Sequence, residues 1–112
     1  MPRTALSAVV GLGLSPLSRR PIGTARDLAR LAVERAVADA GLALGAVDGL
    51  LIARSPLVLP DEIPLTLQND LGLRDLRLLS AIDGEGSSTM QMLHTATLAV
   101  RQRLARTVVC VF

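Results

Sequence analysis

The stretch 76–112 constrains the fold more than any other part of the sequence, because it reads as a strand, a glycine-rich turn, an apolar helix and a strand. The strands are expected at Leu76–Ile82 and Thr107–Phe112, and the helix at Thr89–Leu104. A turn that leads from a buried strand into a helix directs free backbone N–H groups outward, and α/β proteins commonly place chemistry at such a point. The turn at residues 83–88 is therefore the first candidate for a functional site.

The first half of the chain carries the signals of a helix that covers a sheet. Thr24 is a good N-cap residue, and Asp27 stands at the capping-box position. Apolar residues then keep helical spacing over Ala25–Ala40, and Gly41 is expected to end the helix. An ordinary amphipathic helix of this kind packs on a sheet and needs no catalytic role.

Two short apolar runs are expected to be further strands that are buried on both faces. They are Ala5–Leu12 and Leu50–Ala53. A short helix is predicted at Glu62–Leu71, capped by Asp61 and ended by Gly72. Strands that alternate with helices predict an α/β fold with a mostly parallel sheet.

The helix expected at Thr89–Leu104 has more apolar surface than this chain can cover. Its first charged residue is Arg101, and its apolar residues fall on more than one face. Such a helix is normally buried on several sides, yet the chain has 112 residues and a single aromatic residue, Phe112. We therefore expect residues 1–112 to be one segment of a larger fold, completed by more protein or by an obligate partner.

Charge and cysteine content argue against several functions. All 12 basic residues are arginine, they are spread along the chain, and the net charge is only +2. Because no aromatic residue is available to stack on bases, no nucleic-acid groove is expected. The single cysteine, Cys110, excludes an internal disulfide and fits a reducing compartment. No apolar stretch reaches the length of a membrane span, so the sequence predicts a soluble cytoplasmic protein without a membrane partner.

Four side chains of the turn could carry chemistry, and each has a structural alternative. Asp83 and Glu85 precede a helix start, where they could act as acid and base or serve as charges stabilised by the helix dipole. The second interpretation is favoured. Ser87 and Ser88 stand where the dipole could activate a nucleophile, although N-capping by one or the other is favoured.

Two reactive residue types outside the turn are expected to be structural. His94, the only histidine, lies in the apolar helix without a second ligand at metal-binding spacing, so a packed, hydrogen-bonded role is favoured. Cys110 stands among valines and is expected to be a small buried residue. No metal and no bound cofactor is predicted. The pair Gly11-x-Gly13 lacks the third glycine of a dinucleotide-binding turn.

Several segments, taken in order, resemble the thiolase superfamily, and most closely its sterol-carrier and lipid-transfer branch. They are the apolar start with its two glycines at Ala8–Arg19, the helix and strand entry at Leu31–Leu51, and the unit Ile82–Val111. The resemblance implies a fold of two related α/β halves stacked in alternating layers of helix and sheet. It also implies a dimer that acts on thioesters of coenzyme A. Residues 1–112 would be the N-terminal segment of such a domain.

The resemblance further implies a nucleophilic cysteine at the start of the buried helix, where this sequence has Gly86. Glycine cannot form an acyl-enzyme, so thiolysis or Claisen condensation through this position is not expected. A shift of one residue would place Ser87 there. Similar sequences with a glycine-rich turn include thiolase-like aldolases of sterol side-chain breakdown, which cleave carbon–carbon bonds by retro-aldol chemistry and work with a zinc-ribbon and OB-fold partner.

We therefore predict a thiolase-like, acyl-CoA-binding protein that lacks the nucleophilic cysteine and belongs to an acyl-CoA lyase, aldolase or lipid-transfer assembly. Coenzyme A thioester is the expected substrate, and the expected partner is a C-terminal thiolase-like half or a second subunit in a homo- or hetero-oligomer. The alternatives are a non-catalytic scaffolding subunit that shapes a pocket beside an active condensing enzyme or thiolase, and a decayed fragment. The catalytic candidates are Asp83, Glu85 and Ser87, and the substrate-binding candidates are Gly84, Gly86 and Ser88.

Overall fold

The computed structural model describes residues 7–53 and 63–112. Helices alternate with strands along the chain, and a short 3₁₀ turn comes before β1 and another before α3. The elements in order are α1 (Ala25–Asp39), η1 (Leu44–Ala46), β1 (Gly49–Ala53), α2 (Ile63–Leu71), β2 (Leu78–Ile82), η2 (Glu85–Ser87), α3 (Ser88–Arg101) and β3 (Val108–Val111).

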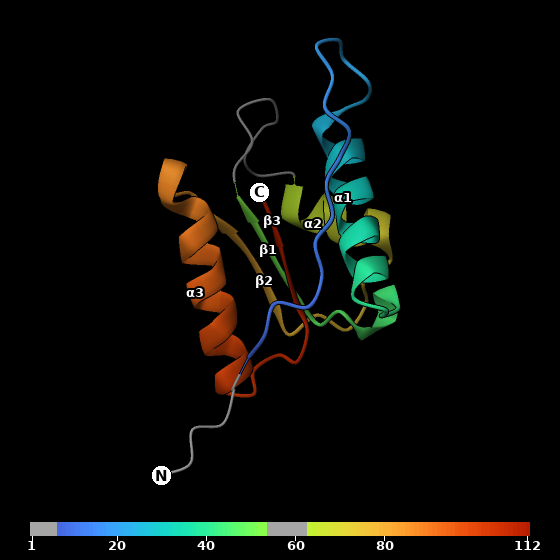
Figure 1. The fold of residues 1–112 in the computed structure, drawn as a ribbon. Coiled ribbons are helices and arrows are strands. Elements are labelled where there is room, and N and C mark those ends of the chain that lie inside the picture. Colours follow the sequence, from blue (N-terminus) through green and yellow to red (C-terminus); the bar gives the residue numbers. More distant parts are fainter. Residues whose placement is uncertain (1–6, 54–62) are drawn as a thin grey trace.

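Three parallel strands form one sheet in the order β2-β1-β3. Gly49 at the start of β1 pairs with Leu78 of β2 and with Val108 of β3, so the three strands begin at the same end of the sheet. α1 and α2 lie on one face of the sheet and α3 lies on the other (Figure 1). This arrangement confirms the predicted α/β class and the parallel sheet, with β2 and β3 slightly shorter than expected.

β1 is the centre of the core because both of its faces are covered. Leu50 and Ile52 pack with residues of α1 and α2. Leu51 and Ala53 point to the opposite face and pack with Met92 of α3. Alternate residues of a strand point to opposite faces, so a strand in the middle layer must be apolar throughout. Burial of each leucine contributes about 1.5–3 kcal/mol.

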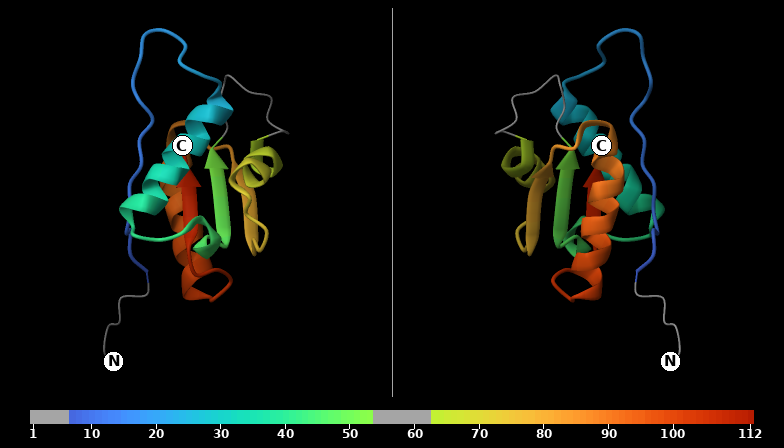
Figure 2. Two further views of the ribbon diagram at one scale, coloured as in Figure 1. Left: turned by 90° about the vertical axis from the view of Figure 1, so that its right-hand side faces the viewer. Right: turned by 90° about the vertical axis from the view of Figure 1, so that its left-hand side faces the viewer.

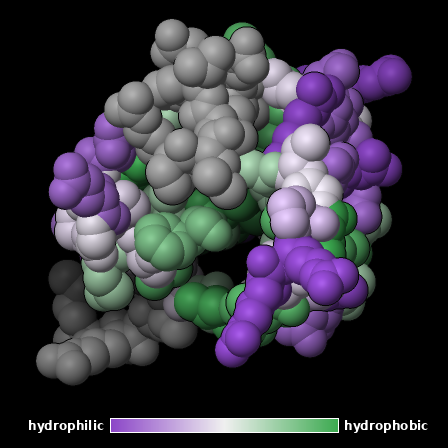
Figure 3. Space-filling view, turned by 90° about the horizontal axis from the view of Figure 1, so that it is seen from above, coloured by the Kyte–Doolittle hydropathy of each residue, from purple (hydrophilic) through white to green (hydrophobic). Residues whose placement is uncertain are grey.

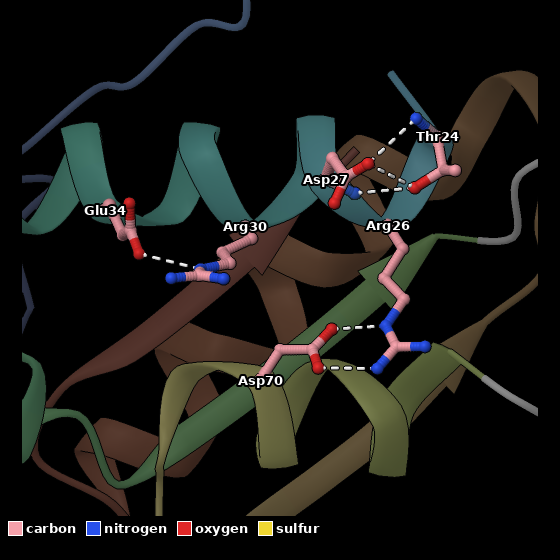
Figure 4. Close-up of polar contacts among 6 residues, drawn as sticks. All are labelled: Thr24, Arg26, Asp27, Arg30, Glu34 and Asp70. Carbon is pink, nitrogen blue, oxygen red and sulfur yellow. Dashed lines mark hydrogen bonds and ion pairs between the residues drawn. The ribbon is translucent and has the colours of Figure 1, made fainter.

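The helix ends follow the signals in the sequence. Thr24 Oγ1 accepts the Asp27 N–H at 3.1 Å, and Asp27 Oδ2 accepts the Thr24 N–H at 3.1 Å, which completes the capping box of α1 (Figure 4). The bond from the Thr24 backbone N–H, followed by the bond from its hydroxyl, lowers the pKa of Asp27. Gly41 and Gly72 close α1 and α2 with φ of 71° and 67°, a left-handed conformation that glycine adopts easily. The predicted cap Asp61 lies outside the described residues.

The prediction of a buried strand at Ala5–Leu12 is wrong for the residues that the structure describes. Residues 7–12 belong to no strand, and from Gly11 onward the chain runs along α1 instead of joining the sheet (Figure 1). Val9 and Val10 are 80% and 63% exposed. A short apolar run between glycines suits a buried strand, but it does not reveal which surface covers it.

Contacts with α1 explain the course of this segment. A Cβ at Gly11 or Gly13 would overlap the backbone of α1, so the two glycines allow the chain to lie directly on the helix. The Leu12 N–H donates to Asp39 Oδ2 at 2.9 Å, and the Arg35 side chain donates to the carbonyl of Leu14 at 2.7 Å. Side chains of α1 thus satisfy part of the backbone that a neighbouring strand would otherwise satisfy.

Asp48 ties the starts of the strands together. Its Oδ1 accepts the backbone N–H groups of Arg106 and Thr107 at 2.9 and 2.8 Å. Its backbone carbonyl accepts the Arg77 N–H at 2.7 Å, and its own N–H donates to the Thr107 carbonyl at 3.1 Å. One residue therefore fixes β1 against the entry to β2 and against the entry to β3.

Candidate functional site

The predicted turn lies at the end of the sheet where the parallel strands finish, between β2 and α3 (Figure 1). The Ser87 N–H donates to the Gly84 carbonyl at 3.0 Å, and the Ser88 N–H donates to the Glu85 carbonyl. The turn thereby satisfies two backbone donors before α3 begins. Ligands of open α/β sheets bind outside the carboxyl ends of the strands, so the turn occupies the expected place for a site.

Both serines of the turn hold Gly84. Ser87 Oγ donates to the Gly84 carbonyl at 2.7 Å, and Ser88 Oγ accepts the Gly84 N–H at 3.0 Å. Ser88 is only 3% exposed. The predicted N-capping role is wrong for Ser87, whose side chain makes no cap hydrogen bond at the start of α3. The 3₁₀ turn is the reason, because it places the hydroxyls beside Gly84 rather than beside the free donors of the helix.

Gln91, one helical turn into α3, completes this network and was not predicted. Its Nε2 donates to Ser87 Oγ at 2.8 Å. The only signal in the sequence is its spacing of four residues from Ser87, which puts both side chains on one face. Among the described residues no base accepts the Ser87 proton, which goes to the Gly84 carbonyl. Because a serine needs an adjacent base to become a nucleophile, the observed bonds stiffen the turn instead.

The two carboxylates of the turn, Asp83 and Glu85, are exposed. Glu85 has a φ of 50°, a left-handed conformation that costs a side-chain-bearing residue about 1–2 kcal/mol. Strained backbone of this kind clusters at functional sites. Within the described part of the chain, nothing hydrogen-bonds the Glu85 side chain, so its carboxylate is available to a group outside it.

The two glycines of the turn have different surroundings. A Cβ at Gly84 would lie 2.5 Å from Gln91 Nε2 and 2.8 Å from Ser87 Oγ, so the network itself requires a glycine there. A Cβ at Gly86 would meet no atom within 4 Å, and its φ is not left-handed. Neither packing nor backbone conformation therefore requires Gly86, and the space beside it is open. Gly45 in η1 has equally open surroundings.

The predictions for His94 and Cys110, both expected to be buried structural residues, compare differently with the structure. The prediction of a packed histidine is wrong, because His94 lies on the exposed side of α3 and hydrogen-bonds to no described residue. Its position among apolar neighbours in the sequence did not reveal which side of the helix it occupies. Cys110 is half-buried and packs against the cluster of Leu51 and Met92. Burial raises the pKa of its thiol, which keeps it protonated.

One side of α3 is uncovered, as the sequence predicted. Met90, Leu93 and Leu98 are 69%, 37% and 47% exposed, while Met92 and Ala99 on the other side are buried. α3 is the one helix on its face of the sheet among the described residues (Figure 2). Seen from the end where the strands finish, hydrophobic surface is exposed between hydrophilic surface on either side (Figure 3). The turn therefore borders a helix side on which Met90, Leu93 and Leu98 are exposed together with Gln91 and His94.

Residues 7–53 and 63–112 were compared with the requirements of a metal-binding cluster and of a membrane-spanning helix. No group of three or more histidine, cysteine, aspartate or glutamate side chains in this part of the chain could hold a metal ion. None of its helices is both long enough and apolar enough to cross a membrane.

Sheet order, turn and helix together define an α/β protein whose parallel sheet ends at a glycine-rich helix start. The solved structure of the Ltp2-ChsH2(DUF35) aldolase is similar to this chain, with a TM-score of 0.81 and 28% sequence identity over 92% of this chain and 26% of that chain. The chain thus spans about a quarter of the length of that relative. No protein-family model and no curated protein matches the sequence.

Proposed function

We propose that this chain forms part of a thiolase-like lyase that cleaves a carbon–carbon bond of an acyl-CoA thioester by retro-aldol chemistry. The similarity to an aldolase over 92% of the chain carries the proposal. The open space at Gly86 supports it, because a nucleophilic side chain that would be acylated in a thiolase has no counterpart there. The activity belongs to a complete assembly, since the matched part is 26% of the aldolase chain.

A retro-aldol cleavage needs a base and a stabilised enolate, and it needs no covalent attachment to the protein. The base removes the proton of the β-hydroxyl group, the bond between the α- and β-carbons breaks, and a carbonyl compound leaves. The electron pair of the broken bond becomes the enolate of the shorter thioester, which then takes a proton. Backbone N–H groups at a helix start are suited to the enolate oxygen, because charge develops there.

Asp83 and Glu85 are the candidates for the proton transfers. Both are exposed at the turn, and Glu85 has a left-handed backbone there. Gly84 and Gly86 would form the floor beneath the thioester, while the buried Ser88 would hold Gly84 in place through its hydrogen bond. In this scheme Ser87 orders the turn through its bonds to Gly84 and Gln91 and forms no acyl-enzyme.

The uncovered side of α3 is the place where the rest of the assembly would pack. A C-terminal thiolase-like half or a second subunit would bury Met90, Leu93 and Leu98 and exclude water from the turn. Water exclusion strengthens the electrostatic interactions of a site. A zinc-ribbon and OB-fold protein is a candidate for the further partner, in line with the two-protein name of the similar aldolase.

A scaffolding role is the second candidate function. The observation in its favour is that no described residue pairs a nucleophile with a base at the turn. In that case the open space at Gly86 would shape a pocket for substrate held by an active condensing enzyme or thiolase.

The deciding experiment is an activity assay of the complete assembly, purified with a tag on this chain. A β-hydroxyacyl-CoA is incubated with the wild type and with Asp83→Asn and Glu85→Gln variants, and the products are identified by mass spectrometry. We expect a carbonyl compound and a shortened acyl-CoA, and a loss of about 100-fold or more in the variant that lacks the base. Unchanged turnover in both variants would favour the scaffold. An acyl adduct on Ser87 would contradict both proposals.

A further inference from the structure

Five exposed arginines lie on the two connections that lead into β2 and β3, at the end of the sheet where the strands begin. Two precede β2, one is the last residue of α3 and two lie between α3 and β3, and Asp48 binds the backbone of both connections. The sequence suggested an even spread of arginine, but the parallel register brings these two connections to one end of the sheet. We call this set, together with Leu104, the arginine surface. Its members are Arg74, Arg77, Arg101, Arg103, Arg106 and Leu104.

The charges of the arginine surface are not used within the described chain. None of its five guanidinium groups forms an ion pair or a hydrogen bond with residues 7–53 or 63–112. The contrast is α1, where Arg26 pairs with Asp70 and Arg30 pairs with Glu34 (Figure 4). Asp48 is close to the surface, but its carboxylate accepts backbone N–H groups. The nearby Asp75 is exposed and also forms no ion pair with described residues.

Arg103 stands where glycine would be more stable. After α3 the Arg103 N–H donates to the Val100 carbonyl at 3.1 Å and the Leu104 N–H donates to the Ala99 carbonyl at 2.9 Å. This is the closing motif that α1 and α2 complete with Gly41 and Gly72. Arg103 adopts a φ of 58° there, which strains a residue with a Cβ. A non-glycine residue that adopts a strained left-handed backbone, and whose side chain has no partner in the described chain, indicates a role in binding another molecule.

Leu104 indicates the kind of partner. It follows Arg103 directly and is 48% exposed between that residue and Arg106. An apolar side chain among arginines is typical of protein interfaces, where arginine is enriched and apolar residues occupy the centre. The arginines lie on two exposed connections, so a carboxylate-bearing protein face fits them better than a single phosphate group does.

We infer that the arginine surface docks an acidic face of a protein partner, with an apolar side chain of that partner on Leu104. The surface lies at the opposite end of the sheet from the turn at Gly86. A protein bound there leaves the candidate active site open. The inference stands without the proposed function, because none of the turn residues takes part in it.

Fluorescence anisotropy of labelled acidic peptides tests this inference with the full chain. The probes are poly-glutamate and a glutamate-rich peptide of equal length with leucine at its centre. We expect the leucine-bearing peptide to bind more tightly, and Leu104→Ser to remove that difference. Arg101→Gln with Arg106→Gln should weaken binding of both peptides about fivefold at low salt. The matched control, Arg19→Gln with Arg20→Gln, removes the same charge from an exposed loop and should leave binding unchanged.

Arg103→Gly separates docking from folding, because it should weaken peptide binding while it raises the melting temperature. Equal losses in the two double variants would overturn the inference, since they would reveal only a response to net charge. Tighter arginine-dependent binding of duplex DNA, of phosphatidylserine vesicles or of coenzyme A than of the leucine-bearing peptide would overturn it as well.

Discussion

The two faces of the sheet differ in how much protein covers them. The face beneath α1 and α2 has a core of eight buried residues, and a two-bonded Arg26–Asp70 ion pair joins the two helices above it (Figure 4). The face beneath α3 has three buried core residues and a single helix whose outer side is exposed. The first face has the larger buried core among the described residues, although Leu65 of α2 is 68% exposed. The second face is covered by α3 alone in the described part of the chain.

The α1–α2 face holds most of the buried core residues among those described, whereas the candidate site lies at the start of α3. Residues of the α1–α2 face satisfy one another, and the ion pairs among described residues both begin on α1. The turn, which contains the strained Glu85 and the open space at Gly86, leads into α3 on the less covered face of the sheet. A site that requires a second body of protein to close it would be expected on such a face, and substitutions can test that reading in order of their expected size.

The largest contrast is expected between two methionines of α3. Met92 is fully buried and Met90 is 69% exposed. Met92→Ala should lower the free energy of unfolding by about 2–4 kcal/mol, because it leaves a cavity, whereas Met90→Ala should change it by less than about 0.5 kcal/mol. Urea denaturation measures both. Met90→Ala should weaken the complete assembly instead, and equal losses in the isolated chain would break the comparison of the two faces.

A smaller loss of stability is expected when Asp48, which connects β1 to the starts of β2 and β3, is replaced. Asp48→Ala removes the acceptor of the Arg106 and Thr107 N–H groups. The two donors are exposed or half-buried, so water replaces part of the lost bonding, and a loss of about 1 kcal/mol is expected in urea denaturation. Amide hydrogen exchange should accelerate at Thr107 and not in the capping box of α1. Uniform acceleration throughout the chain would contradict a local role.

Arg103→Gly should raise the free energy of unfolding instead of lowering it. The substitution relieves a side-chain-bearing residue at a φ of 58°, so thermal unfolding should show a gain of about 1 kcal/mol. The matched substitution Gly41→Arg at the end of α1, where φ is 71°, should destabilise the chain by a similar amount. A loss of stability in Arg103→Gly would show that the arginine has an internal role after all.

The smallest effect on stability is expected when the pH is lowered. It should come from carboxylates of α1 and α2. The hydrogen bond from Arg26 holds the pKa of Asp70 below its ordinary value, and the Thr24 backbone N–H does the same for Asp27. A carboxyl whose pKa is lower in the folded state stabilises the fold above its unfolded pKa, and that contribution disappears as pH falls through the folded pKa. Stability should therefore decline below about pH 4. Asp70→Asn should flatten the decline, whereas Asp75→Asn, at an exposed position, should leave it unchanged.

The sequence predicted the elements whose signals are local. Thr24 with Asp27, Gly41 and Gly72 marked the helix ends, and Leu50–Ala53 was apolar enough to be a buried strand. Long-range packing was not visible. Nothing in the order of residues showed that Gly11 and Gly13 would lay the first segment on α1.

The candidate site was predictable in place but not in detail. Its turn was expected where it lies, because a glycine-rich segment followed a strand and opened a helix. The bond from Gln91 to Ser87 and the left-handed backbone of Glu85 depend on the three-dimensional path of the turn, and the four-residue spacing of Ser87 and Gln91 does not by itself predict either of them.

The most direct measurement of the central claim compares Gly86→Ala with Gly45→Ala in the proposed lyase assembly. Both glycines lie in the middle of a 3₁₀ turn with no atom within 4 Å of an added Cβ, so neither substitution should alter the stability of the chain. If Gly86 faces the substrate, its replacement should lower kcat/KM for a β-hydroxyacyl-CoA at least tenfold, while Gly45→Ala keeps wild-type activity. Equal activity of the two variants would contradict the claim that this turn is the floor of the site.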